Sequence, residues 1–124
     1  MDSTNKSIGN FGEEVAAKYL IEIGYIILDK NFRYKTGEID LIGKDGEFIT
    51  FIEVKTRTST NFGEPCEAVT PAKQLKIYKT AEIYIMKKKL FKFNFRFDVL
   101  EVILSNHKKD YSIRLIKDAF QIWS

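Results

Sequence analysis

The sequence is poor in the residues that build disulfide frameworks and the most common catalytic centres. Cys66 is the only cysteine in 124 residues, which excludes an internal disulfide and a cysteine-based zinc site. His107 is the only histidine, so histidine metal clusters, Ser-His-Asp triads and Cys-His hydrolases are not expected. The seven glycines are scattered and form no phosphate-binding loop. The chemistry that remains is that of carboxylates and lysines.

Long apolar runs are also lacking. No run approaches the ~20 residues that a membrane-spanning helix needs. The opening Met-Asp-Ser-Thr-Asn-Lys is not followed by the apolar core of a secretory signal, so we expect a cytoplasmic protein without membrane contact. Hydrophobic residues make up 44% and charged residues 30% of the chain. This composition and length predict a single domain, residues 1–124, with its own core.

Acidic and basic residues are unevenly distributed. Residues 1–56 include seven basic and ten acidic residues, a net charge of −3, whereas residues 70–97 include eight basic residues and one acidic residue, a net charge of +7. An acidic part beside a basic part is typical of a metal-dependent enzyme that acts on a polyanion. A solvated helix face with a lysine-rich end would give the same pattern, and the sequence leaves both interpretations open.

Residues 37–57 predict a β-hairpin. Two apolar, β-branched runs flank Asp45-Gly46, a dipeptide typical of tight hairpin turns. A turn centred on this dipeptide pairs Lys44 with Glu47. Because side chains alternate between the two faces of a strand, this pairing determines which residues share a face.

Three ionisable residues share one face of the predicted hairpin. Asp40 lies opposite Phe51 in this register, and alternation places Glu53 and Lys55 on the face of Phe51. The diagonal distance from Asp40 to Glu53 is roughly 7–8 Å between backbone positions, which lets two carboxylates converge on one cation. Aliphatic neighbours indicate a sheet covered on both sides, where ionisable groups are costly unless they are paired or bind metal. An ordinary ion pair on a solvated edge is the alternative.

Periodicity elsewhere predicts helices that flank a mixed sheet. The expected elements are a first helix ending at Gly24, a strand over 25–28, the hairpin, a helix from Thr70 to about Lys88, and strands over 91–97 and 111–115. Glu13 lies on the border of the buried stripe of the first helix. It is therefore the early acid that can reach the sheet.

The order of these residues resembles that of the PD-(D/E)XK nuclease superfamily. Glu13 on an early helix is followed by Asp40 and then by Glu53-Val54-Lys55 on the next strand. The resemblance implies the restriction-endonuclease-like fold, an α/β fold with a mixed central β-sheet flanked by helices.

Further segments resemble the YraN family, small bacterial proteins that are similar to archaeal Holliday-junction resolvases. These segments are Gly12-Glu13, Asn31-Phe32-Arg33, 37–42, 51–57, Phe62-Gly63, Ala68-Val69, Lys73 and Arg96-Phe97-Asp98. Together they cover nearly the whole chain. One departure from the superfamily pattern is Ile39, which stands where a proline often precedes the aspartate.

The resemblance implies a Mg²⁺- or Mn²⁺-dependent endonuclease that hydrolyses phosphodiester bonds, with branched DNA as the substrate class suggested by the resolvases. Asp40, Glu53, the backbone carbonyl of Val54 and Glu13 would hold the metal. Lys55 would activate water and stabilise the charge that develops on phosphate. Hard cations prefer oxygen ligands, which fits this set of donors.

Basic residues from Arg57 onward extend the expected interface with nucleic acid. They are Arg57, Lys73, Lys76, Lys87, Lys88, Lys89 and Arg96. A non-catalytic nucleic-acid-binding module or scaffold with a nuclease fold is the alternative function. The sequence leaves open DNA against RNA, linear against branched substrate, and monomer against homodimer.

Overall fold

The structure is a computed structural model that describes residues 4–58, 69–105 and 110–122, with side chains from residue 9 onward. Cys66 and His107 lie outside these ranges. The elements in chain order are α1 (Thr4–Glu22), β1 (Ile26–Tyr34), β2 (Gly37–Asp45), β3 (Phe48–Thr58), α2 (Pro71–Lys88), β4 (Asn94–Leu104) and β5 (Tyr111–Ile116). Neither helix of the described part is long and apolar enough to cross a membrane.

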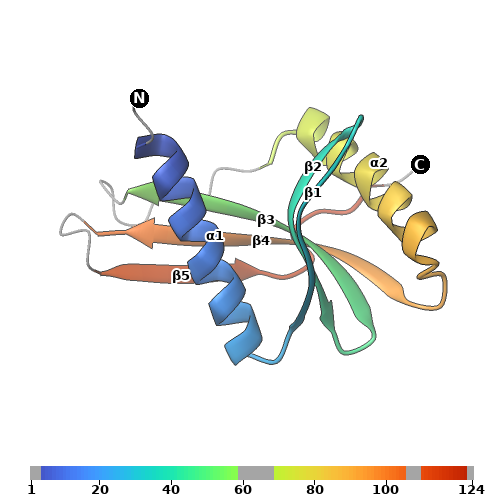
Figure 1. Ribbon diagram of the computed structural model, residues 1–124, viewed down its shortest axis with the longest axis horizontal. Coiled ribbons are helices and arrows are strands. Elements are labelled where there is room, and N and C mark those ends of the chain that lie inside the picture. Colours follow the sequence, from blue (N-terminus) through green and yellow to red (C-terminus); the bar gives the residue numbers. More distant parts are fainter. Residues whose placement is uncertain (1–3, 59–68, 106–109, 123–124) are drawn as a thin grey trace.

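The strands form one mixed sheet in the order β1-β2-β3-β4-β5. The first three strands make an antiparallel meander that contains the predicted hairpin, β3 runs parallel to β4, and β5 returns antiparallel to β4. A parallel pair needs a crossover connection, and α2 lies in it. α1 lies across one face of the sheet, and α2 packs on the other (Figure 1). This is the restriction-endonuclease-like α/β arrangement that the sequence predicted.

The two helices cover separate hydrophobic clusters. α1 contributes Ala16 and Leu20 to a cluster that includes Ile52 of β3. α2 contributes Tyr84, among others, to a cluster that includes Phe51 of β3. Adjacent residues of β3 therefore point to opposite faces, and both faces are buried. This explains why the apolar runs of the hairpin are nearly continuous.

Gly12 lets α1 approach the sheet closely at β3. A Cβ atom added at Gly12 would lie 1.8 Å from Oγ1 of Thr56, which is far too short for two heavy atoms that are not bonded to each other. Thr56 is the residue after Lys55 on β3 and lies three residues after Glu53. It therefore belongs to the end of β3 that carries these two charged residues. The missing side chain of Gly12 thus sets how close α1, with Glu13, lies to that end of β3.

We expect Gly12→Ala to lower the free energy of unfolding by about 1–3 kcal/mol, the usual cost of overpacking. Gly9→Ala is the matched control, because nothing lies within 4 Å of a Cβ at Gly9 in the same helix and alanine favours helix. Denaturant unfolding of both variants measures the difference. The double variant Gly12→Ala/Thr56→Ala should recover part of the loss. Equal stability of the two single variants would contradict the close approach.

The hairpin register differs from the predicted one by two residues. Asp45 pairs with Phe48, and Ile42, rather than Asp40, lies opposite Phe51. The turn is centred on Gly46 and Glu47, with Gly46 at a positive φ of 61°, as in turns that place glycine at the first central position. A shift of two residues preserves alternation where the strands are paired, so Ile42 and Phe51 share a face and belong to the same cluster.

β1 is longer than predicted, because it continues to Tyr34. Its register against β2 shifts between Ile27 and Asp29, which marks a β-bulge at Leu28, and Asn31 has a positive φ of 53°. These two irregularities interrupt the alternation that identifies a strand in a sequence.

The strand predicted over 91–97 begins later, at Asn94. Lys89 ends α2 in the left-handed conformation and donates its backbone N–H to carbonyls of the last turn, so the chain turns before it extends. Phe91 consequently lies in the turn with 67% of its surface exposed. Helix α2 itself matches the prediction, with Thr70 as its N-cap.

Candidate functional site

Asp40 lies where β2 and β3 separate. The last regular pair of the two strands is Leu41 with Ile52. One residue further, Oδ2 of Asp40 accepts a hydrogen bond from the backbone N–H of Val54 at 2.8 Å. The side chain therefore replaces a backbone partner at the end of the ladder and is fixed next to Glu53.

The surroundings of Asp40 oppose its ionisation. Burial and then the Glu53 carboxylate raise the pKa of Asp40 to about 7, Glu13 and Glu38 add to the rise, and the Val54 hydrogen bond partly offsets it. A cation bound between the carboxylates would remove this repulsion. Strongly shifted carboxyl groups of this kind cluster at functional sites.

Glu53 is also largely buried, with 13% of its side chain exposed. Its Oε2 lies 3.3 Å from Nζ of Lys73, whose side chain is 49% exposed. Lys73 belongs to the first turn of α2, where its backbone N–H is capped by the hydroxyl of Thr70 at 3.2 Å. The sequence grouped Lys73 with the basic surface, and the structure places it at the acidic pair.

Glu13 reaches the same region from α1. Burial raises the pKa of Glu13, with smaller contributions from Glu38 and Glu53. With its amide nitrogen turned toward the acids, Asn31 donates to Oε1 of Glu13 at 3.0 Å and to Oε2 of Glu38 at 3.2 Å. Glu38 also forms an ion pair with Arg33 at 3.0 Å.

Sequence reasoning assigned no role to Asn31. This residue holds acids from α1 and β2 together, and it does so from a left-handed backbone conformation that asparagine tolerates better than most residues. The sequence signal was present only in the motif Asn31-Phe32-Arg33.

Lys55 follows Glu53 by two residues on β3 and is half-buried. Within the described ranges its ammonium group forms no ion pair. Arg57 lies two residues further along β3, and its Nε is 3.4 Å from Oε2 of Glu101. Glu101 is buried on β4, with 1% of its side chain exposed, so it draws Arg57 toward the sheet.

The donors fit a cation site with few protein ligands. No three Asp, Glu, His or Cys side chains of the described part of the chain are grouped to hold a metal ion. Asp40 and Glu53 form a pair of carboxylates, Glu13 contributes to the raised pKa of Asp40, and Glu53 contributes to the raised pKa of Glu13. Mg²⁺ is usually bound by one or two carboxylates together with water and substrate phosphate, so a pair is a suitable donor set for it.

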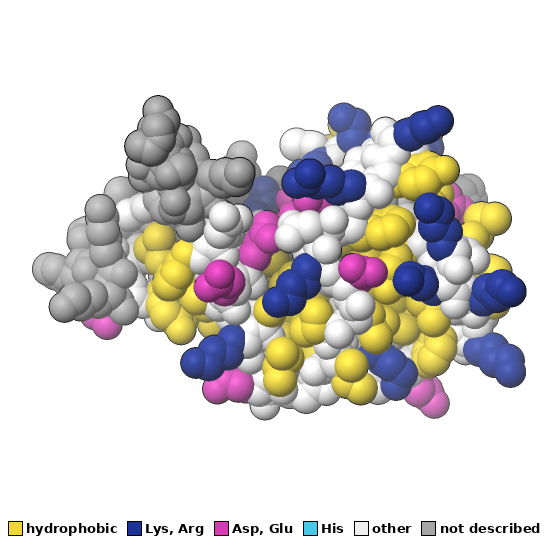
Figure 2. Space-filling model, in the orientation of Figure 1, with side chains coloured by type: hydrophobic (Ala, Val, Ile, Leu, Met, Phe, Trp, Pro, Cys, Tyr) yellow, Lys and Arg dark blue, Asp and Glu magenta, His cyan; other side chains and the backbone are white. Residues whose placement is uncertain are grey.

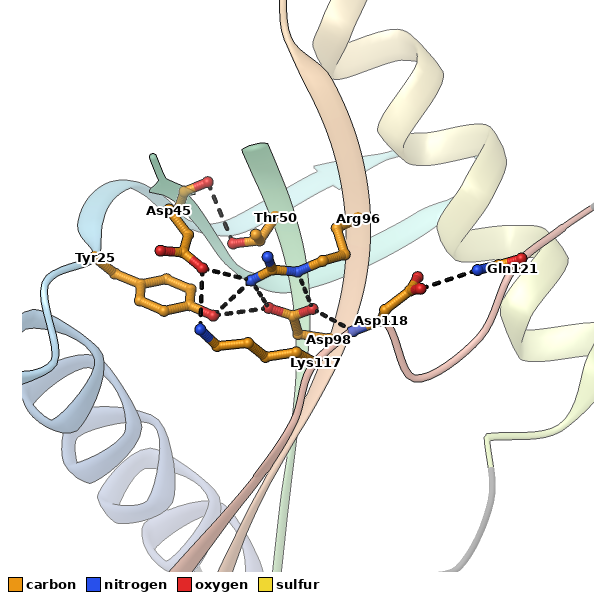
Figure 3. Close-up of polar contacts among 9 residues, drawn as sticks. Tyr25, Asp45, Thr50, Arg96, Asp98, Lys117, Asp118 and Gln121 are labelled. Carbon is orange, nitrogen blue, oxygen red and sulfur yellow. Dashed lines mark hydrogen bonds and ion pairs between the residues drawn. The ribbon is translucent and has the colours of Figure 1, made fainter. Parts of the chain in front are cut away.

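Arg96 belongs to a separate network at the opposite end of β2 (Figure 3). Its guanidinium group donates to both oxygens of Asp98 and to Asp45, and Tyr25 donates to Asp98. Asp98 is fully buried and also accepts the backbone N–H of Asp118 at 2.9 Å. The carboxylates of Asp98 and Asp45 raise the pKa of Arg96.

This network corrects the sequence-based view of Arg96. Only 11% of its side chain is exposed, and two carboxylates already neutralise it. Arg96 therefore does not add to the exposed basic surface, and its role in the structure is to join β2 to β4.

The remaining basic residues of the predicted nucleic-acid interface lie on α2 and directly after it. Lys76, Lys87, Lys88 and Lys89 are exposed. Nζ of Lys87 lies 4.9 Å from the ring centre of Tyr34, and Nζ of Lys88 lies 5.9 Å from that of Tyr84. Figure 2 shows lysine and arginine side chains around α2, with hydrophobic side chains between them.

Comparison with known proteins identifies the family. Residues 12–102 match the uncharacterised protein family UPF0102. UPF0102 proteins of Clostridium tetani and Clostridium kluyveri are 63% and 60% identical over 122 residues, and one of Clostridium botulinum is 60% identical over 123 residues. Each alignment covers 98% of this chain and 100% of the relative. The chain therefore belongs to the UPF0102 family, which confirms the resemblance to the YraN proteins.

Proposed function

We propose that the protein is a Mg²⁺- or Mn²⁺-dependent endonuclease that hydrolyses phosphodiester bonds in nucleic acid, with branched DNA as the favoured substrate class. The supporting observation is the fixed, crowded pair of Asp40 and Glu53 at the end of the β2–β3 ladder, with Lys55 on the same strand as Glu53. Such a pair is costly in the free protein, and binding of a cation would offset that cost.

Each residue has a distinct role in this proposal. Asp40 and Glu53 would hold the cation with their carboxylates, and the carbonyl of Val54 would supply a further oxygen. When bound, the metal lowers the pKa of water and neutralises charge on phosphate. Lys55 orients the attacking water and stabilises the charge that develops on phosphate, for which a half-buried lysine without an ion-pair partner in the described ranges is suited. Glu13 adds negative charge behind the pair.

A second candidate is a nucleic-acid-binding module without catalysis. The observation in its favour is that the described side chains form no group of three metal-ligating residues and that Lys73 already neutralises Glu53. Such a module would bind nucleic acid through the lysines of α2 and would not need Asp40.

The direct test is a panel of linear, flapped, single-stranded and four-way-junction substrates, as DNA and as RNA, incubated with Mg²⁺ or Mn²⁺. Cleavage that requires the metal supports the nuclease and identifies the substrate. Binding without cleavage of any substrate favours the module.

We expect the triple variant Lys87→Ala/Lys88→Ala/Lys89→Ala to bind nucleic acid more weakly and with a flatter dependence on salt. The slope of log K against log salt is negative, and each phosphate contact that is lost reduces its magnitude by about 0.9. The magnitude should therefore decrease by up to about three units. Fluorescence anisotropy at several salt concentrations measures it. The control is Lys18→Ala/Lys30→Ala, which removes exposed lysines of α1 and β1. An unchanged slope would remove residues 87–89 from the interface.

A further inference from the structure

The ion pair between Lys73 and Glu53 joins a constrained carboxylate to a movable ammonium group. Glu53 is 13% exposed and projects from the central strand β3, whereas the side chain of Lys73 is 49% exposed. The backbone of Lys73 is fixed, because it lies in the capped first turn of α2. Only the four-carbon stem of the lysine is free to change the position of its charge.

Lys73 is the cation that compensates Glu53 in this structure. Among the described residues, no other basic side chain forms an ion pair with Glu53. The nearby Arg33 and Arg57 form ion pairs with Glu38 and Glu101. The ammonium group of Lys73 therefore occupies the electrostatic position that a bound cation would take.

The same position suits Lys73 poorly once a divalent cation is present. The ammonium is 3.3 Å from the Glu53 oxygen, so a metal ion on that carboxylate would place two positive centres within a few ångströms of each other. Like charges at such a distance repel by more than ~1 kcal/mol even when they are well solvated. The half-exposed side chain can relieve the repulsion by moving toward solvent, where phosphate groups of a substrate would lie.

We infer that Lys73 is an exchangeable counter-cation, which neutralises Glu53 in the metal-free protein, competes with the metal for it, and contacts a substrate phosphate once the metal is bound. This inference rests on the proposed metal site of Asp40 and Glu53. It adds a positioning residue and a form of regulation to that site.

The exchange makes metal binding and phosphate binding cooperative. A phosphate that attracts Lys73 removes the competitor of the metal, and a metal that displaces Lys73 supplies a partner for phosphate. Linkage requires the two effects to be equal in size. The protein would then hold its metal several-fold more tightly when nucleic acid is present.

The test compares Lys73→Met, which keeps an unbranched side chain without charge, with Lys79→Met on the same helix. Lys79 is exposed and forms no ion pair among the described residues. Mn²⁺ is titrated by calorimetry into each protein, alone and with a DNA four-way junction whose phosphorothioate linkages resist cleavage. The conservative variant Lys73→Arg is titrated in parallel.

In the absence of DNA, Lys73→Met should bind Mn²⁺ about two- to fivefold more tightly than the parent, the equivalent of a partly exposed ion pair. DNA should tighten Mn²⁺ binding by the parent and by Lys79→Met, and should do so much less for Lys73→Met. Lys73→Arg should behave as the parent does.

Equal Mn²⁺ affinity of Lys73→Met and the parent, or an equal effect of DNA on both, would overturn the exchange while leaving the metal site intact. A parent protein that binds no Mn²⁺ in either condition would instead overturn the proposed nuclease function, and the exchange with it.

Discussion

Asp40→Asn is expected to reduce cleavage by several orders of magnitude while the protein stays folded. The substitution keeps the shape of the side chain and removes the charge that holds the metal, so water activation and charge stabilisation fail together. The asparagine carbonyl can still accept the hydrogen bond from Val54. Nucleic-acid affinity should hold or rise, because one negative charge near the phosphates has gone.

The melting temperature of Asp40→Asn should depend on pH in a defined direction. The pKa of Asp40 in the folded protein is about 7, above the value of 3.8 expected for the unfolded chain. The folded parent therefore keeps this proton between about pH 4 and pH 7 whereas the unfolded chain loses it, and stability of the parent falls as the pH rises through this interval. The variant lacks this loss, so it should melt at or above the parent at pH 8, and the difference should shrink as the pH falls toward about 4.

Metal binding by the parent should depend on the protonation of Asp40. Because Asp40 must lose its proton to bind a cation, Mn²⁺ affinity should increase as the pH rises toward about 7 and level off above it. Cleavage, melting and Mn²⁺ titrations on one preparation test the three expectations together. An Asp40→Asn protein that cuts at the parent rate, or that melts well below the parent at pH 8, would show that Asp40 is not a metal ligand.

Asp98→Ala is expected to destabilise the protein by about 3–5 kcal/mol, because it leaves the guanidinium group of Arg96 buried without its main partner. This corresponds to a fall of roughly 10–20 °C in melting temperature for a chain of this size. The substitution also removes the acceptor of Tyr25 and of the backbone N–H of Asp118. Thermal unfolding measures the effect.

Two further variants distinguish the effect of leaving Arg96 without its partner from the effect of removing any carboxylate. Asp118→Asn removes an exposed carboxylate nearby and should change the melting temperature little. Asp98→Ala/Arg96→Met removes both charges and should be more stable than Asp98→Ala alone, because no unpaired charge is left in the interior. A double variant that is no better than the single one would show that packing around Asp98, rather than its charge, holds the strands together.

The grouping of acids on the hairpin could be predicted because it depends only on alternation. The predicted turn was displaced by one residue and the pairing by two, yet Asp40 and Glu53 still lie close enough to interact electrostatically, since an even shift of the pairing leaves alternation unchanged. Asp45 belongs to β2, and its carboxylate is held by Arg96 and Lys117. The local preference of Asp45-Gly46 for the centre of a turn contains no information about those distant partners.

The features that the sequence did not predict depend on contacts between distant segments. The polar stretch after Leu28 was not recognised as strand, because a bulge and the left-handed Asn31 interrupt its pattern. Arg96 was assigned to an exposed surface from its charge alone, whereas it is neutralised by Asp98 of its own strand and by Asp45 of another strand. Lys73 could be placed on a helix but not at Glu53, because the crossover geometry decides which residue the first turn of α2 approaches.

The position of β3 between an antiparallel and a parallel neighbour has a consequence for folding kinetics. The β2–β3 hairpin closes through a two-residue turn, so its contacts have low sequence separation and should form early. The β3–β4 pairing must await the whole α2 crossover, and contacts of high sequence separation form slowly. Asp40 and Glu53 thus meet within the early hairpin, whereas Lys73 reaches Glu53 only when the crossover closes. We therefore expect the two acids to meet during folding before the lysine that neutralises one of them arrives.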